Sequence, residues 1–394
     1  MKIYEIGTGY TPIPAQMGAA TEIVVEELTR SFLKLGENVE IIDIAADSRA
    51  ETDLPISEVR VPKFIRKKDV SLGLMHKVKR VVYSVKLALA LKKILKKSNE
   101  KVILHFHNQY NMFFFLKLVG KKYREKATIL YTNHSYVWHG EWDEIKDTID
   151  SRYFQEVASM KEADFIFVLN EQTKKNIVEH IGINNSKVYL IDNGVNTDTY
   201  RKLPEAEIEA LKEQYNIKGK KAFVQVGSVC DRKNQLTSIK LLLPLMKADE
   251  NVVFLYAGGI ISEEYQQQIA DFAKENSLQD RVIYCGELSP GEELNRFYNL
   301  GSAMLFPSKA EGFSLVILEA MSAGVPVFVY ENLLFKLSDK CLRFKDEADF
   351  ERIMNERILT QGREELSREV RQAVLENYGW DKVASDYRDI ASLR

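Results

Sequence analysis

Two glutamates, Glu311 and Glu319, flank the predicted start of a helix and are the first candidates for chemistry. An apolar run at 303–306 predicts a buried strand, and after a loop Ser314 can cap a helix that Gly324 ends in the left-handed conformation. The first turn of a helix offers free N–H groups and a partial positive charge, which suit a phosphate. The spacing places one carboxylate on the loop and one on the helix. Such a pair is also common in α/β proteins without any site.

The longer string around these glutamates resembles the signature of retaining glycosyltransferases of family 4. Its pattern is a glutamate, seven residues, a second glutamate, a small-residue helix end and Pro-Val. The resemblance implies the GT-B fold, an α/β fold in which two doubly wound Rossmann-like domains face each other across a cleft. It places Glu311 beside the transferred sugar and Glu319 on the ribose hydroxyls of the nucleotide. It also implies that the backbone N–H groups of Ser314, Leu315 and Val316 contact the diphosphate.

A second candidate lies after the apolar strand predicted at 222–226, where Gly227 precedes the basic pair Arg232 and Lys233. A strand followed by glycine and nearby cations is a plausible anion site. In the family, the matching loop has Gly-Arg and then a lysine six residues after the glycine, and both cations bind the donor diphosphate. Lys233 matches that lysine. Ser228 stands where the arginine is expected, and Arg232 is the candidate to replace it.

Histidines follow two predicted strands of the N-terminal half. The strand at 101–106 leads to His105 and His107, and the strand at 128–132 leads to His134. Ligands of open α/β sheets collect at the carboxyl ends of strands, although a histidine there is also common as a hydrogen-bonded core or surface residue. In the family, a histidine that matches His134 hydrogen-bonds the donor sugar. We expect His107 to be a weaker candidate and His105 to alternate onto the opposite face as a structural residue.

The resemblance implies two further donor contacts. Gly18 matches a small-residue turn before the first helix, near the diphosphate, and Leu288 follows the predicted strand at 281–285, where the family holds the nucleotide base by its main chain. A dinucleotide fingerprint is a poor match, because Gly7 and Gly9 lie far from Gly18.

The segment from Arg60 to Lys101 is strongly basic, with 14 Lys or Arg against 2 acids, although the whole chain carries a net charge of only −2. Within it, apolar residues from Val78 to Leu89 recur at helical spacing on one face. One interpretation is a packed helix with a solvated basic side. The other is a peripheral contact with anionic lipid head groups, to which each basic residue contributes about 1 kcal/mol. No recognised binding motif accompanies the charge, so we expect no nucleic-acid partner.

The length of 394 residues predicts two domains. We expect an acceptor-side domain at 1–196, a nucleotide-sugar-binding domain at 197–375, and a helix at about 376–394 that packs back on the first. No apolar run reaches 18 residues, and no signal-peptide core opens the chain. Three scattered cysteines form neither a zinc pattern nor a disulfide framework. These features predict a cytoplasmic protein, peripheral at the inner face of the plasma membrane if the basic segment binds lipid.

The resemblance implies transfer of a sugar, with retention of its anomeric configuration, from a nucleotide-diphosphate sugar to an acceptor hydroxyl. We expect UDP as the nucleotide, a glycan or lipid-linked acceptor of the bacterial cell envelope, and no separate cofactor. No Asp-x-Asp string occurs, so we expect no essential metal. A nucleotide-sugar epimerase of the same fold, and a non-catalytic relative serving as a scaffold, remain alternatives. The scaffold alternative is best supported by Ser228, which replaces the arginine expected in the family.

Overall fold

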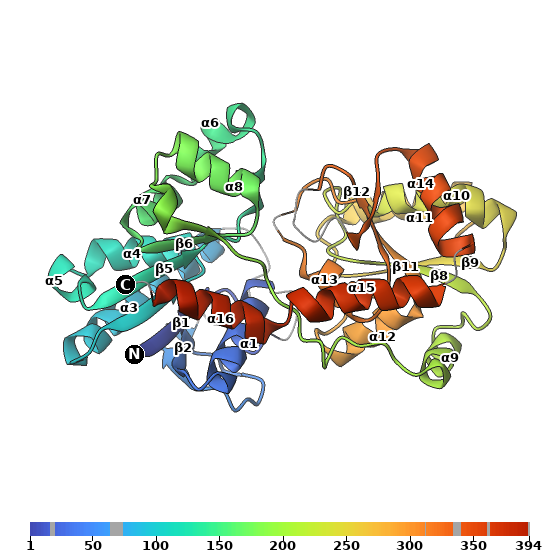
Figure 1. Ribbon diagram of the computed structural model, residues 1–394. Coiled ribbons are helices and arrows are strands. Elements are labelled where there is room, and N and C mark those ends of the chain that lie inside the picture. Colours follow the sequence, from blue (N-terminus) through green and yellow to red (C-terminus); the bar gives the residue numbers. More distant parts are fainter. Residues whose placement is uncertain (16–19, 64–73, 312, 334–339, 361–362, 393–394) are drawn as a thin grey trace. The chain divides into compact units, whose positions relative to one another are not determined.

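The computed structural model describes residues 1–15, 20–63, 74–311, 313–333, 340–360 and 363–392. It divides the chain into two α/β units (Figure 1). Unit 1 consists of Met1–Asn193 and Trp380–Arg394, and unit 2 of Gly194–Gly379. The predicted class, two doubly wound α/β domains, is confirmed.

Unit 1 is built on a parallel sheet of seven strands in the order β3-β2-β1-β4-β5-β6-β7. The strands are β1 (Lys2–Ile6), β2 (Asn38–Ile44), β3 (Ile56–Val59), β4 (Val102–Phe106), β5 (Ala127–Thr132), β6 (Phe165–Val168) and β7 (Val188–Leu190). The central strands are almost continuously buried because helices cover both faces, as parallel sheets require.

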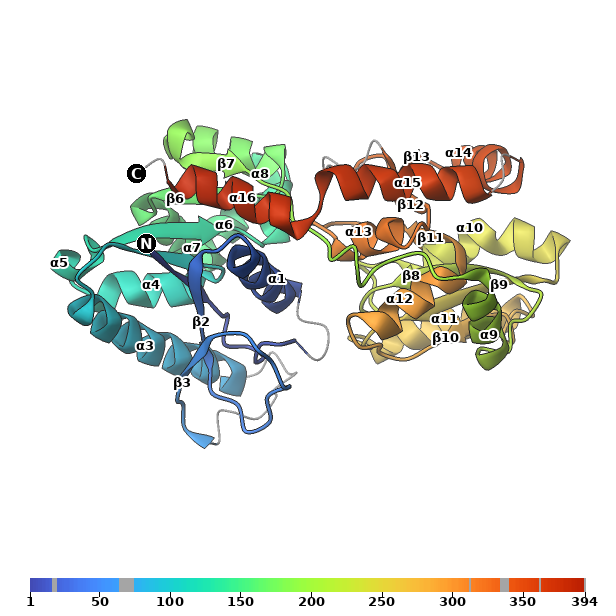
Figure 2. The ribbon, with the colours of Figure 1, turned by 60° about the horizontal axis from the view of Figure 1, so that its bottom comes forward.

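The helices of unit 1 form two layers. On one face, α3 packs on α4, and on the other α1 packs on the C-terminal helix α16 (Figure 2). The helices are α1 (Ala20–Lys34), α3 (Leu74–Lys97), α4 (Gln109–Leu118), α5 (Lys121–Arg124), α6 (Trp142–Arg152), α7 (Phe154–Glu162), α8 (Glu171–Lys175) and α16 (Trp380–Ala391), with short turns η1 (Tyr136–His139), η2 (Asn176–His180) and η3 (Asn185–Lys187). Thus the end of the chain returns to unit 1 and covers part of its sheet.

Unit 2 is built on a parallel sheet of six strands in the order β10-β9-β8-β11-β12-β13. The strands are β8 (Lys221–Val226), β9 (Val252–Ala257), β10 (Val282–Tyr284), β11 (Gly301–Phe306), β12 (Val327–Tyr330) and β13 (Leu342–Phe344). Counted within the unit, this is the strand order 3-2-1-4-5-6 of the doubly wound nucleotide-binding fold.

The helices of unit 2 also form two layers. One contains α10, α11 and α14, and the other contains α9, α12, α13 and α15 (Figure 1). Their bounds are α9 (Glu205–Gln214), α10 (Gln235–Ala248), α11 (Glu263–Glu275), α12 (Glu292–Leu300), α13 (Leu315–Ser322), α14 (Glu347–Ile353), η5 (Met354–Thr360) and α15 (Arg363–Asn377).

Both sheets reverse their strand order at the centre, between β1 and β4 in unit 1 and between β8 and β11 in unit 2. Connections leave in opposite directions from such a pair, so the edge beyond their carboxyl ends is left open for a ligand. The candidate residues predicted from the sequence follow these central strands and their neighbours.

Candidate functional site

In unit 2, the loops that follow β8 and β11 are joined by hydrogen bonds at the centre of the sheet. The backbone N–H of Lys309 donates to the carbonyl of Arg232 at 2.9 Å. The side-chain amide of Asn234 donates to the carbonyl of Pro307 at 3.1 Å. The predicted anion loop and the loop of the first glutamate are therefore one assembly.

The carboxylate of Glu311 collects three donors from these loops. Its Oε1 lies 2.6 Å from Nζ of Lys233 and 2.8 Å from Nη1 of Arg232, and it accepts a 2.6 Å hydrogen bond from the hydroxyl of Ser308. The same Arg232 nitrogen donates to the carbonyl of Ala310 at 2.9 Å. Arg232 thus points toward Glu311 beside Lys233, which the sequence did not show.

Lys233 is held in a largely dry position. Its side chain is 12% exposed, and its Nζ lies 4.9 Å from the centroid of the Phe306 ring. Burial lowers the pKa of Lys233 below its ordinary value of 10.5, although the charge of Glu311 acts in the opposite direction. A poorly hydrated ammonium that shares its carboxylate with an arginine would gain from an additional anion.

Glycines keep the strand ends beside Lys233 free of side chains. Gly227 has φ of 151°, and a Cβ there would lie 3.3 Å from Cδ of Lys233. Gly258, at the end of β9, has φ of 143°, and its Cβ would lie 2.2 Å from the carbonyl oxygen of Gly227. A side chain at either position would be strained, and at Gly258 it would also collide with backbone.

The helix α13 begins immediately after this cluster. Ser314 occupies the N-cap position as predicted, but its side chain makes no capping hydrogen bond. Leu315 and Val316 open the helix, and their N–H groups belong to the first turn, where no intrahelical acceptor exists. Gly324, with φ of 75°, follows the end of the helix in the left-handed conformation, as predicted. Residue 312 lies outside the described residues.

The second glutamate, Glu319, lies on the wall of α13 and is 5% exposed. Its Oε2 accepts a hydrogen bond of 2.7 Å from the hydroxyl of Tyr298 on α12. Burial, and then the charge of Glu319, raise the pKa of Tyr298 well above its usual range, so the tyrosine stays a donor. Leu288 is half-buried and packs on the core of unit 2 after β10.

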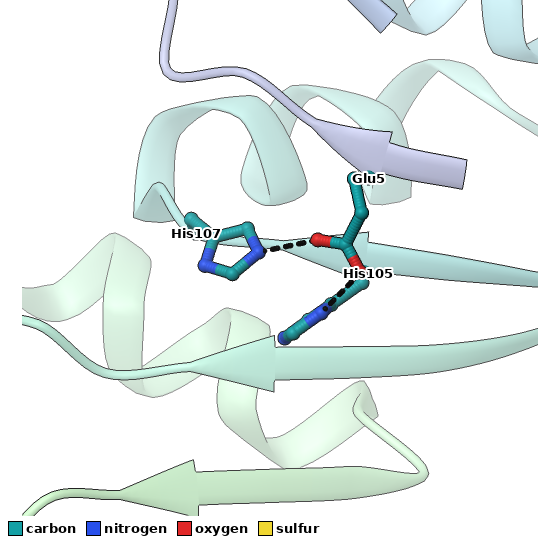
Figure 3. A group of neighbouring side chains, drawn as sticks. All are labelled: Glu5, His105 and His107. Carbon is teal, nitrogen blue, oxygen red and sulfur yellow. Dashed lines mark hydrogen bonds and ion pairs between the residues drawn. The ribbon is translucent and has the colours of Figure 1, made fainter. Parts of the chain in front are cut away.

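In unit 1, three histidines and one acid form a second polar cluster, of which Figure 3 shows Glu5, His105 and His107. Glu5, on the central strand β1, has one oxygen 2.9 Å from Nδ1 of His105 and the other 2.8 Å from Nε2 of His107. The Nδ1 of His107 lies 3.0 Å from Nε2 of His134, which follows β5. The two predicted strand ends therefore do meet.

The prediction that His105 turns to the opposite face is wrong. His105 and His107 are two residues apart, and side chains two apart on an extended chain point to the same face. Both therefore reach Glu5, which the sequence analysis missed. A signal was available, because Glu5 is an acid within the otherwise apolar central stretch of β1.

The environment favours the charged form of Glu5 but the neutral forms of His107 and His134. Burial alone would raise the pKa of Glu5, but the charge and hydrogen bond of His105, together with those of His107, hold it at about 2. Burial, and then the charge of His105, lower the pKa of His107 to about 4. Burial, and then the charges of His107 and His105, lower the pKa of His134 well below its usual range. At neutral pH, Glu5 is ionised and both His107 and His134 are uncharged.

Ligand atoms of Glu5, His105 and His107 all lie within 4.8 Å of one another, a spacing that a metal ion could bridge. Each of these atoms is already used in one of the hydrogen bonds above. The cluster is therefore complete as a hydrogen-bonded network of side chains.

The loop that carries His134 is held by a separate buried carboxylate. Glu156 on α7 accepts from Asn133 at 2.9 Å and from the indole of Trp138 at 2.8 Å, and it also accepts from the hydroxyl of Tyr131. Three donors fix the end of β5 and the turn after it, so the backbone on either side of His134 is anchored.

Family models match both units. The model described as "Glycosyltransferase Family 4" matches residues 21–199, and the model described as "Glycosyl transferases group 1" matches residues 207–335. The chain belongs to the family 4 glycosyltransferases. The family predicted from the sequence is thus confirmed.

The individual relatives have low sequence identity to this chain. A 41.2 kDa protein of the cps region of Klebsiella pneumoniae is 28% identical over 59% of this chain and 60% of its own length. The alpha-galactosylglucosyldiacylglycerol synthase of Streptococcus pneumoniae is 28% identical over 40% of this chain and 41% of its own. The structure of Anabaena HepE in complex with UDP and glucose superposes with a TM-score of 0.72, with 13% identity and 100% of both chains covered. That last likeness shows the fold.

The group 1 model spans Glu311, Glu319 and the two cations, and the family 4 model spans the three histidines of the unit 1 cluster but not Glu5. Gly18 lies outside the described residues, so its predicted contact is not tested. Ser228 is half-buried, and its carbonyl accepts from the side-chain amide of Gln235 at 3.0 Å.

The prediction for the basic segment needs a correction in α3. Of the apolar residues chosen from the sequence, Val78 is 38%, Val81 45% and Leu89 51% exposed, whereas Ala88 is fully buried. The helix is instead buried through its other face, which includes Tyr83 and Leu87. Residues 64–73 lie outside the described residues. The reason for the error is that both faces of α3 are apolar, so periodicity alone could not choose between them.

Proposed function

We propose that the protein transfers a sugar from a nucleotide-diphosphate sugar to an acceptor hydroxyl, with retention of the anomeric configuration. The observation that carries the proposal is the convergence of Lys233 and Arg232 on Glu311, at the strand-order reversal of unit 2. Two cations beside the first turn of α13 form a site for a diphosphate. The carboxylate between them is positioned for the adjoining sugar.

The proposed chemistry uses positioned charge. When the bond between the anomeric carbon and the diphosphate breaks, Lys233, Arg232 and the start of α13 stabilise the charge that develops on the leaving oxygen. The acceptor hydroxyl attacks the anomeric carbon on the same face, and its proton passes to that leaving phosphate oxygen. Glu311 orients the sugar, and no side-chain nucleophile is required. We propose that the two cations replace a metal ion in this role, since the sequence has no Asp-x-Asp string.

We propose UDP as the nucleotide, with Glu319 on the ribose hydroxyls and the backbone around Leu288 on the base. The complex of HepE with UDP and glucose, on the same fold, supports the choice of nucleotide. The hydroxyl of Tyr298 holds one oxygen of Glu319 in place, and a fixed carboxylate suits recognition of a diol.

The test uses the purified full-length protein with UDP-, GDP- and ADP-sugars, with and without lipid and glycan acceptors, and measures nucleotide release. Transfer from a UDP sugar, unaffected by EDTA, with the anomeric configuration of the product retained by NMR, is the expected result. A changed sugar without transfer would indicate an epimerase. Binding without turnover of any donor would favour the non-catalytic scaffold. That alternative is motivated by Ser228, which stands where the family has an arginine.

We also propose that α3 makes a peripheral contact with an anionic membrane surface, and that the acceptor is a lipid-linked or cell-envelope glycan. The exposed Val78, Val81 and Leu89 lie on a helix whose Lys86 and Lys93 are exposed as well. Apolar side chains flanked by lysines suit the interface of an anionic bilayer. No helix among the described residues has the length and apolar character needed to span a bilayer. This arrangement would place the protein at the inner face of the plasma membrane.

Flotation with vesicles of phosphatidylglycerol or of phosphatidylcholine, at low and high salt, tests the contact. Lys86→Glu with Lys93→Glu should release the protein from the anionic vesicles. Lys247→Glu with Lys274→Glu, at exposed positions of α10 and α11, makes the same change of charge and should leave binding intact. If the wild-type protein ignores both vesicle types at low salt, a soluble acidic acceptor is the better proposal.

A further inference from the structure

Most of the polar cluster of unit 1 is buried within the unit. Glu5 is fully buried, as is His105, and His107 is 4% exposed. A carboxylate on the central strand of a parallel sheet costs several kcal/mol in desolvation unless its partners compensate. The arrangement of its partners therefore indicates what Glu5 does.

The hydrogen bonds of Glu5 have a defined direction. An ionised carboxylate only accepts, so both Nδ1 of His105 and Nε2 of His107 must carry the protons in these contacts. His107 is neutral, so its Nδ1 has no proton and accepts. Nε2 of His134, at 3.0 Å, must then be the donor. The charge of Glu5 thus determines which nitrogen of His107 carries the proton, and His107 in turn determines which nitrogen of His134 does.

We propose that Glu5 and His107 are positioning residues that hold His134 in the tautomer protonated on Nε2, so that its Nδ1 is a hydrogen-bond acceptor for a substrate hydroxyl. Within the described residues, the structure shows no hydrogen-bond partner for Nδ1 of His134. An acceptor nitrogen recognises the O–H of a sugar and rejects a carbonyl or phosphate oxygen. The assignment of the hydroxyl to a sugar rests on the proposed function, whereas the tautomer does not.

The other oxygen of Glu5 is held by a separate arm. Nε2 of His105 lies 2.7 Å from the hydroxyl of Thr132, which is 3.1 Å from the hydroxyl of Tyr387 on α16. This arm anchors Glu5 to the C-terminal helix but makes no contact with His134. The two arms therefore provide a matched test and control.

The direct test is the ring nitrogen spectrum of the ¹⁵N-labelled protein at pH 7, since the chain has only 6 histidines. His134→Gln and His107→Gln spectra assign the signals. We expect His134 to show a protonated Nε2 and an unprotonated Nδ1. A proton on Nδ1, or protons on both nitrogens, would overturn the proposal.

Two variants separate positioning from general disturbance. His107→Gln keeps a donor for Glu5 but removes the ring nitrogen that faces His134, so the signals of His134 should shift toward a mixture of tautomers. Tyr387→Phe removes a hydroxyl from the other arm and should leave His134 unchanged. An equal change in both variants, or none in His107→Gln, contradicts the role of His107.

Ligand titrations complete the test. UDP-glucose should shift the Nδ1 signal of His134, whereas UDP, which lacks the sugar, should bind without shifting it. If UDP-glucose binds and Nδ1 does not respond, the hydroxyl contact is wrong and the proposed function stands. If no nucleotide sugar binds, the proposed function and this contact fail together, and the tautomer is judged by its own spectrum. If Zn²⁺ displaces the protons shared with Glu5 and EDTA restores them, the cluster is a metal site and the proposal is overturned.

Discussion

The two units have the same strand order around the centre of their sheets. At the point where that order reverses, however, unit 2 has two cations around one carboxylate and unit 1 has a buried carboxylate among histidines. In unit 2, Lys233 and Arg232 share the single carboxylate of Glu311 on two partly open loops. In unit 1, the ionised Glu5 lies inside the sheet and is surrounded by histidines. The topology provides a place for a ligand in both units, and the side chains decide what that place can do.

The difference between the two carboxylates is one of solvent access. Glu311 pairs with Lys233, whose side chain is 12% exposed, and with Arg232, whose side chain is 36% exposed and can turn to water or to a ligand. Glu5 and its two histidines have almost no such access. A buried group of this kind stabilises a single arrangement, whereas the cluster of unit 2 can exchange partners.

The largest expected effect contrasts these two acids. Glu5→Ala should destabilise unit 1 by roughly 3–5 kcal/mol, because it leaves buried histidines without their acceptor. Glu311→Ala should cost less, about 1–2 kcal/mol, because Arg232, one of its two cations, can reach solvent, while sugar transfer is largely lost. Urea unfolding followed by far-UV circular dichroism reports both units, and the fluorescence of the 3 tryptophans, which all belong to unit 1, reports that unit. The comparison fails if Glu311→Ala destabilises the protein as much as Glu5→Ala.

A second prediction uses Glu22 on α1, another buried acid of unit 1. Burial raises the pKa of Glu22 from 4.5 to about 7, although a hydrogen bond from Thr8 opposes this. The folded state holds the proton more tightly, so this stability is fully present below pH 4.5 and is lost as pH rises through 7.

Glu22→Gln removes the effect. Its free energy of unfolding, relative to wild type, should increase by roughly 3 kcal/mol between pH 4.5 and pH 8. The measurement is urea unfolding at several pH values, again by tryptophan fluorescence. A constant difference between the two proteins would show that Glu22 ionises normally in the folded state.

The third prediction concerns the cations of unit 2. Lys233→Met should lower kcat/KM for the nucleotide sugar by about 10- to 150-fold, corresponding to about 1.5–3 kcal/mol for a charged hydrogen bond. Lys309→Met is the control, because Lys309 lies on the adjoining loop, is 52% exposed and pairs with Asp231. Equal losses in both variants would mean that general positive charge, and not the buried site, binds the donor.

The smallest effect is expected at Tyr298, which holds Glu319. Tyr298→Phe removes one neutral donor to a carboxylate, so stability should fall by about 1 kcal/mol and affinity for UDP by a few-fold. Glu319→Ala should weaken UDP binding by more, about 10- to 150-fold. Isothermal titration with UDP measures both. Unchanged affinity in Glu319→Ala would contradict its assignment to the ribose.

Much of unit 2 could be predicted because its site is local in the sequence. The strand, loop and helix around Glu311 lie within about twenty residues, and apolar runs, Ser314 and Gly324 mark their bounds. The family signature occupies the same stretch.

Unit 1 was less predictable where the interacting residues are far apart in the sequence, or where a helix is apolar on both faces. The contact of Glu5 with His107 joins residues 102 apart, and α3 is apolar on both faces, so the pattern did not show which face is buried. The direction in which Arg232 points was likewise absent from the sequence. Each of these outcomes depends on which strands and loops become neighbours.

The amino-acid sequence determined the local elements, the family, and the carboxylates and cations of the unit 2 loops, because helix caps, glycines and apolar runs act over a few residues. Only the tertiary structure decided that Lys233 and Arg232 share Glu311, and that Glu5 contacts His105 and His107, the second of which contacts His134. The physical reason is that hydrogen bonds and ion pairs are short-ranged: their partners are chosen by the pairing of β1 with β4 and of β8 with β11, and that pairing is a property of the whole sheet.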